Sequence, residues 1–161
     1  MTKFRPLPPI QELQQAFDYD PATGLFRNKY SRGKARQGAL AGTVCSRGYL
    51  HIVYKWQTML AHRAAWLLMT GDDPLHKHVD HADRIPAHNW FSNLRLSTDS
   101  QNTANKICKG WTRTPSGKYQ VYIKIGSKHV YLGLFSTPEE ATEVYKAKHI
   151  EVYGSFSPYF Q

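Results

Sequence analysis

A short stretch of this chain concentrates side chains that could hydrolyse a phosphodiester. Asp80 and His81 are adjacent, and Asn93 and Asn102 follow His81 by twelve and twenty-one positions. Carboxylate and amide oxygens suit a hard cation such as Mg²⁺ (or Mn²⁺), so we expect Asp80 and Asn102 to be metal ligands. A neutral imidazole near pH 7 can take a proton from water, which would make His81 a general base. These residue types therefore predict metal-assisted hydrolysis.

Two strands and a helix are predicted around these residues. Residues 76–81 and 94–96 have strand character, and residues 83–92 form the loop between them. Thr98, with Gln101 three positions later, makes a capping box that starts a helix bearing Asn102. The catalytic side chains are thus expected on a strand, loop, strand and helix unit.

A helix and a strand are predicted before this unit. Residues 61–71 are apolar nearly all round and end at Gly71, which predicts a buried helix with Gly71 near its C-cap. Residues 48–56 are rich in aromatic and β-branched side chains and predict a strand. Ile10, Leu13 and Phe17 have the spacing of a short amphipathic helix.

The order of elements around Asp80-His81, Asn93 and Asn102 resembles the ββα-metal motif of the HNH endonuclease superfamily, in its phage- and intron-encoded branch. Further positions typical of that branch stand in this segment: His62-Arg63, Trp66, Asp83 and Asn89. The resemblance implies that Asn93 fastens the loop and orients His81. The sequence departs from the pattern where Arg84-Ile85 replaces the usual Gly-Asn and His88-Asn89 replaces an Asn pair.

Other interpretations of this segment remain open. The same fold with an inactive core would give a DNA-binding regulator, although the joint presence of Asp80, His81 and Asn102 argues against it. A modification-dependent restriction nuclease would need a base-flipping pocket, which the sequence does not reveal. A zinc site is disfavoured, because the spacing of the four nearby histidines does not resemble a closed site and no Cys is near: His76, His78, His81 and His88.

The charge of the chain favours double-stranded DNA as the partner. Lys and Arg number 21 against 12 Asp and Glu, which gives a formal charge of +9 in 161 residues. Residues 21–61 hold seven basic side chains and no acid, and residues 109–135 hold five and no acid. We expect the first of these segments to contact phosphates through three residues of its loop: Arg32, Lys34 and Arg36. Purely solubilising charge is the competing explanation.

The C-terminal third predicts a three-stranded antiparallel sheet packed on one helix. Its motifs are GWTRTPSGKY from Gly110, YLGLF from Tyr131 and TPEEA from Thr137. They are similar to the APETALA-type DNA-binding domain of plant ethylene-response factors, in which the exposed sheet face enters the major groove. The resemblance implies these DNA contacts: Thr112, Thr114, Ser116, Tyr122, Lys124, His129 and Tyr131. Arg and Trp are usual at several of these positions, so the specificity cannot be transferred.

We therefore expect an α+β protein of three modules: a basic region at 1–61, an HNH core at 62–108 and a DNA-binding domain at 109–161. The expected function is site-preferring, divalent-metal-dependent cleavage or nicking of double-stranded DNA, as in homing endonucleases. No signal peptide or membrane span is expected, which predicts an intracellular protein. The pairing of these modules resembles phage-encoded, free-standing homing endonucleases, which implies that a phage encodes this chain. No obligate protein partner is evident, and a monomer would suffice.

Overall fold

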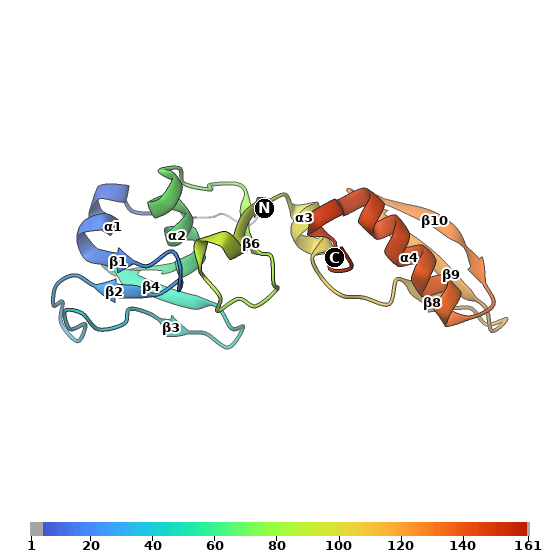
Figure 1. Ribbon diagram of the computed structural model, residues 1–161, viewed down its shortest axis with the longest axis horizontal. Helices are drawn as coiled ribbons and strands as arrows, with labels where there is room; N and C mark the ends of the chain where they lie inside the picture. The colour runs from blue at the N-terminus through green and yellow to red at the C-terminus, as the bar shows by residue number, and fades with distance from the viewer. Residues whose placement is uncertain (1–4, 161) are drawn as a thin grey trace. The chain divides into compact units, whose positions relative to one another are not determined.

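The computed structural model describes residues 5–160 and divides the chain into two compact units (Figure 1). The first unit ends at Ser97 and the second begins at Thr98. The modules expected from the sequence divide elsewhere, after residues 61 and 108, and their terminal residues 1–4 and 161 lie outside the described part. Helices and short antiparallel sheets occur in both units, in agreement with the predicted α+β class.

The first unit combines helices with small antiparallel sheets. Strands β1 and β2 form a hairpin, β3, β4 and β5 form a sheet in that order, and β6 pairs with β7. The bounds are α1 (Ile10–Ala16), β1 (Phe17–Tyr19), β2 (Phe26–Asn28), β3 (Thr43–Val44), β4 (Leu50–Tyr54), β5 (Gln57–Leu60), α2 (Ala61–Thr70), β6 (His78–His81), η1 (Phe91–Asn93) and β7 (Leu94–Ser97).

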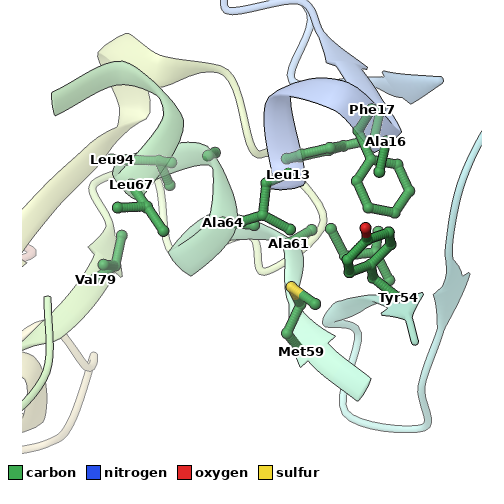
Figure 2. Close-up of a cluster of buried hydrophobic side chains, with 13 residues drawn as sticks. Leu13, Ala16, Phe17, Tyr54, Met59, Ala61, Ala64, Leu67, Val79 and Leu94 are labelled. Atoms are coloured by element: carbon green, nitrogen blue, oxygen red, sulfur yellow. The ribbon is translucent and has the colours of Figure 1, made fainter. Parts of the chain in front are cut away.

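One hydrophobic core joins the N-terminal elements to the strands that carry the candidate site. Leu13 of α1 and Ala64 of α2 are fully buried, and Val79 of β6 and Leu94 of β7 belong to the same cluster (Figure 2). Residues 5–61 and 62–97 therefore share a core, and burial of its apolar surface holds β6 and β7 against α2.

Helix α2 agrees with its prediction, whereas the preceding strand is shorter than predicted. The helix ends at Thr70, and Gly71 caps it in the left-handed conformation with φ 81°. The predicted strand over residues 48–56 begins at Leu50 and stops at Tyr54. It stops there because Lys55 and Trp56 have φ values of 44° and 65° and form a two-residue turn into β5.

The second unit is a three-stranded antiparallel sheet, in the order β10-β9-β8, packed on one long helix. Val121 and Ile123 of β9 pack against Ala141 and Tyr145 of the helix. The predicted sheet and helix are both present, and so is the predicted capping box before α3. The bounds are α3 (Asp99–Ala104), β8 (Trp111–Arg113), β9 (Tyr119–Ile125), β10 (Lys128–Phe135), α4 (Pro138–Tyr153) and η2 (Gly154–Phe156).

The inward face of α4 includes one polar side chain. Ala141, Tyr145 and His149 are buried, whereas Val144 is only half-buried. His149 can lie inside because its Nδ1 lies 2.8 Å from the hydroxyl of Ser157. Across residues 5–160, no helix has the length and apolar character needed to cross a membrane.

Candidate active site

The β6-β7 ladder holds Asp80 and His81 in the first unit. Asp80 is opposite Arg95 in the ladder, and His81 is opposite Leu94. Both Asp80 and His81 are buried. The carboxylate Oδ2 of Asp80 accepts a hydrogen bond from Arg95 Nε at 3.0 Å and lies 3.0 Å from Arg95 Nη2. This ion pair fixes the orientation of the carboxylate and supplies positive charge beside it.

The imidazole of His81 is oriented by Asn89. Its Nε2 lies 3.2 Å from the side-chain oxygen of Asn89, and the Asn89 amide nitrogen donates to the carbonyl of Ala87 at 3.0 Å. Because the amide nitrogen is used there, the oxygen faces the imidazole, and we assign the ring proton to Nε2. With this assignment the neutral tautomer of His81 has its lone pair on Nδ1.

Burial keeps the imidazoles at this site neutral near pH 7. Desolvation lowers the pKa of His81, although Asn89 and the nearby carboxylates oppose the shift. Desolvation and the proximity of His81 lower the pKa of His62 to about 3. The two rings meet edge to face with centroids 4.9 Å apart, and Tyr49 packs on both. His81 is therefore in the form that a general base requires.

Asn93 closes the loop that follows β6. Its side-chain oxygen accepts from the backbone N–H of Asp83 at 3.0 Å, and its amide nitrogen donates to Asp83 Oδ1 at 2.9 Å and to the His88 carbonyl at 2.8 Å. Asp83 Oδ2 also lies 2.6 Å from His88 Nδ1. Burial alone would raise the pKa of Asp83. Hydrogen bonds from Ile85, His88 and Asn93 outweigh it and lower this pKa. Asn93 thus fastens the loop, whereas Asn89 contacts His81.

Asn89 had no predicted role, although its position is one of those typical of the resembled branch. Asn89 is 1% exposed, and its partner lies eight positions away across the loop. Only the position in the motif could have drawn attention to it, because a lone Asn in a polar loop carries no other signal.

The N-terminal hairpin supports the same loop. The Tyr19 hydroxyl donates to the carbonyl of Asn89 at 2.7 Å, and the N–H of Phe91 donates to the carbonyl of Pro21 at 2.8 Å. Gly24 approaches so closely that a Cβ there would lie 2.3 Å from the carbonyl carbon of Asn89. Arg84 stands in the same loop where the resembled family usually has glycine. Its backbone is strained, because its φ is 66°, a conformation that glycine adopts without strain.

The predicted metal ligands fit a hard cation in their chemistry. Asp80 offers a carboxylate and Asn102 an amide oxygen, and a carboxylate has enough lone pairs to pair with Arg95 and bind a cation. Asn102 is half-buried on α3, which belongs to the second unit, so its proximity to Asp80 stays a prediction. Residues 5–160 contain no cluster of three or more His, Cys, Asp or Glu side chains suited to a metal ion. The predicted ligand pair, Asp80 and Asn102, does not depend on such a cluster.

Comparisons with known proteins agree with the motif. Residues 59–104 match the model of the HNH endonuclease family, and this range contains Asp80, His81, Asn93 and Asn102. This segment resembles HNH endonucleases. The chain is also 31% identical over 112 residues to an uncharacterized HNH endonuclease of Acanthamoeba polyphaga mimivirus. That alignment takes in 66% of the chain and 59% of the viral protein.

The match to the family model is confined to residues 59–104. The chain spans less than two thirds of the viral relative, so the activity of that protein as a whole is not transferred. No solved structure matches the chain significantly. The APETALA-type resemblance of residues 109–161 has no support from the comparisons and remains a prediction from the sequence.

The three predicted phosphate contacts of the basic loop differ in their surroundings. The guanidinium of Arg32 lies 4.6 Å from the ring centroid of Phe17 and 5.2 Å from that of Tyr54, and its Nη2 donates to Asn28 Oδ1 at 2.7 Å. Lys34 and Arg36 are exposed. Arg32 therefore packs the loop onto the core, while Lys34 and Arg36 present their charges to solvent.

The predicted DNA-facing side chains of the second unit lie largely on the exposed face of its sheet. Tyr122 and Tyr131 are opposite one another in the ladder with ring centroids 5.2 Å apart, and Lys124 is opposite His129. These four side chains and Thr112 are exposed. Thr114 instead bonds to the backbone of Lys118 within the β8-β9 turn and lies 2.9 Å from the Ser116 hydroxyl.

Proposed function

We propose that this chain is a divalent-metal-dependent endonuclease that cleaves or nicks double-stranded DNA with a preference for certain sites. The observation that carries the proposal is the neutral imidazole of His81, which Asn89 orients beside the Asp80 carboxylate within the segment that matches HNH endonucleases. The excess of basic side chains supports DNA as the substrate.

In this proposal His81 accepts a proton from water at Nδ1 while the water oxygen attacks phosphorus. The new bond between oxygen and phosphorus forms as the bond from phosphorus to the 3′ oxygen breaks. The departing 3′ oxygen takes a proton from solvent, and His81 later releases the water proton to solvent. Asp80 and Asn102 would hold the cation, which when bound neutralises charge on the phosphate and stabilises the departing oxygen. Arg95 orients the Asp80 carboxylate, and Asn93 keeps the loop closed around Asn89.

The remaining parts of the chain would hold the duplex. Lys34 and Arg36 would contact phosphates, which position a protein without reading sequence. The sheet face with Tyr122, Lys124 and Tyr131 would contact base edges in the major groove, which is wide enough for a β-sheet or ribbon. Residues 109–135 contain no acid, and the acids of the C-terminal third lie on α4. A negatively charged partner is therefore favoured at the sheet.

A DNA-binding regulator with an inactive core is the second candidate. One observation favours it, because the Asp80 carboxylate is already paired with Arg95. Incubating the wild-type protein with supercoiled plasmid in Mg²⁺, Mn²⁺ or EDTA separates the two functions. The nuclease produces nicked or linear plasmid in the metal-containing reactions and none in EDTA. The regulator retards the plasmid on a gel but leaves it supercoiled under all three conditions.

A further inference from the structure

Trp56 stands at the tip of the hairpin formed by β4 and β5, and its side chain is fully exposed. The other three tryptophans of the chain are each half-buried: Trp66, Trp90 and Trp111. Trp56 therefore buries none of its surface against the described residues and adds nothing to the core.

The backbone at this tip is also unfavourable for the residues that occupy it. Tyr54 pairs with Gln57, so Lys55 and Trp56 alone make the loop, with φ values of 44° and 65°. Such two-residue turns favour Asn-Gly or Asp-Gly, because both central residues need positive φ. Strain kept at an exposed position without a packing benefit points to a role outside folding.

The hairpin presents the indole rigidly. Lys55 forms an ion pair with Glu12 of α1 at 2.8 Å, and the Gln57 side chain donates to the carbonyl of Pro6 at 2.8 Å. At the base of the hairpin, Ile52 and Met59 belong to the core. Both neighbours of Trp56 are thus fastened to the body of the unit, which lowers the entropy lost when the ring binds a partner.

We propose that Trp56 is a wedge that inserts between neighbouring base pairs of the DNA duplex and stacks on a base. This inference rests on the proposed function, because it takes duplex DNA as the ligand. Residues 21–61, which include the hairpin, hold seven cations and no acid, so their charge complements a polyanion. Because the charge of Lys55 is paired with Glu12, the tip offers an aromatic face for stacking more than a charge for phosphate.

Insertion of a ring between base pairs has a consequence for site preference. In an intact duplex the faces of the bases are covered by their neighbours, so the indole gains stacking only where a step opens. Pyrimidine-purine steps such as TA and CA open and kink most easily, and A-tracts resist. Trp56 would therefore favour a flexible step at a fixed distance from the cleaved bond.

The experiment compares wild type with Trp56→Gly and Trp56→Phe, using 30-base-pair duplexes of mixed sequence in EDTA. Trp56→Gly should weaken binding by roughly 5- to 150-fold, the range for loss of one aromatic-base stack. Its thermal midpoint should equal or exceed that of wild type, because glycine accepts the positive φ. Trp56→Phe should stay within about threefold of wild type in affinity, because a phenyl ring also stacks.

A second readout reports on the DNA itself. Duplexes with 2-aminopurine beside a TA step should brighten when wild type binds and stay dim with Trp56→Gly, because unstacking raises the fluorescence of this base. Affinity of Trp56→Gly within twofold of wild type, or no brightening with wild type at any of the labelled positions along the duplex, would overturn the wedge. Metal-dependent plasmid cleavage by Trp56→Gly at saturating protein concentration would support the nuclease proposal, whether or not the wedge proposal holds.

Discussion

The side-chain oxygen of Asn89 lies 3.2 Å from Nε2 of His81, and the Asn89 amide nitrogen is held by the carbonyl of Ala87. With Nε2 assigned as the donor to this oxygen, the neutral, buried imidazole has its lone pair on Nδ1. Asn89 is in turn held by the Tyr19 hydroxyl through its backbone carbonyl. The proposed general base is therefore oriented by a loop whose support comes from the N-terminal hairpin, outside the HNH segment.

Asn89→Leu should slow DNA cleavage by roughly 10- to 100-fold, the usual effect of losing an orienting partner. DNA affinity in EDTA should be unchanged, since Asn89 is buried. Asn89→Asp is the matched control, because it keeps an oxygen acceptor for Nε2 and should cleave faster than Asn89→Leu. Cleavage by Asn89→Leu within threefold of wild type would show that this hydrogen bond does not orient the base.

Gly24→Ala should destabilise the first unit and slow cleavage, because its Cβ would lie 2.3 Å from the Asn89 carbonyl carbon and 2.4 Å from the Trp90 nitrogen. Displacing this backbone should cost roughly 1–3 kcal/mol beyond the cost of the left-handed conformation. Gly38→Ala is the control, with φ 75° and no atom within 4 Å of the added Cβ. Thermal unfolding and plasmid cleavage of both variants give the comparison, and equal losses would contradict it.

The residues of the basic loop should separate into structural and DNA-contacting groups. Arg32→Ala should lower the free energy of unfolding by roughly 1–3 kcal/mol, because it removes cation-π contacts and a hydrogen bond to Asn28. Lys34→Ala and Arg36→Ala should leave stability unchanged and each reduce the slope of log affinity against log salt by about 0.9. Binding to target and scrambled duplexes across a salt series measures this. An unchanged slope in the Lys34→Ala, Arg36→Ala double variant would remove the loop from the DNA path.

The stability of the second unit should fall as the pH drops below about 6.5, the ordinary pKa of histidine. Burial lowers the pKa of His149 in the folded state, so the unfolded chain binds the proton first and stability decreases with falling pH. His149→Asn keeps a polar group near Ser157 but does not titrate in this range. Hydrogen exchange of the β9 amides between pH 7 and pH 5 should therefore change less in this variant, and equal changes would contradict the assignment.

Elements with local signals were predictable from the sequence. The apolar run before Gly71 gave α2 and its left-handed cap, and Thr98 with Gln101 gave the start of α3, because capping is a local interaction. Apolar and polar side chains alternate from Tyr119 to Ile125, a local pattern that indicates a strand, and these residues form β9. The β4-β5 turn was missed because Lys55 and Trp56 carry no turn signal, and only the pairing of Tyr54 with Gln57 imposes it.

The candidate site was predictable in its residue types more than in its contacts. The spacing of Asp80, His81 and Asn93 follows a motif, so it can be found without a structure. The contacts of His81 with Asn89 and His62 depend on loop closure and on packing of α2 against β6, which no local pattern encodes. Arg32 was predicted to contact phosphate because of its charge. Only the fold shows that its guanidinium packs on aromatic rings.

The most direct test of the central claim is the rate at which His81→Ala cleaves supercoiled plasmid in Mg²⁺ under single-turnover conditions. Its affinity for the same DNA in EDTA is measured alongside. Loss of a general base predicts a rate at least about a hundredfold below that of wild type, with unchanged affinity. A rate within about threefold of wild type would contradict the account, because His81 would then not be the group that activates water.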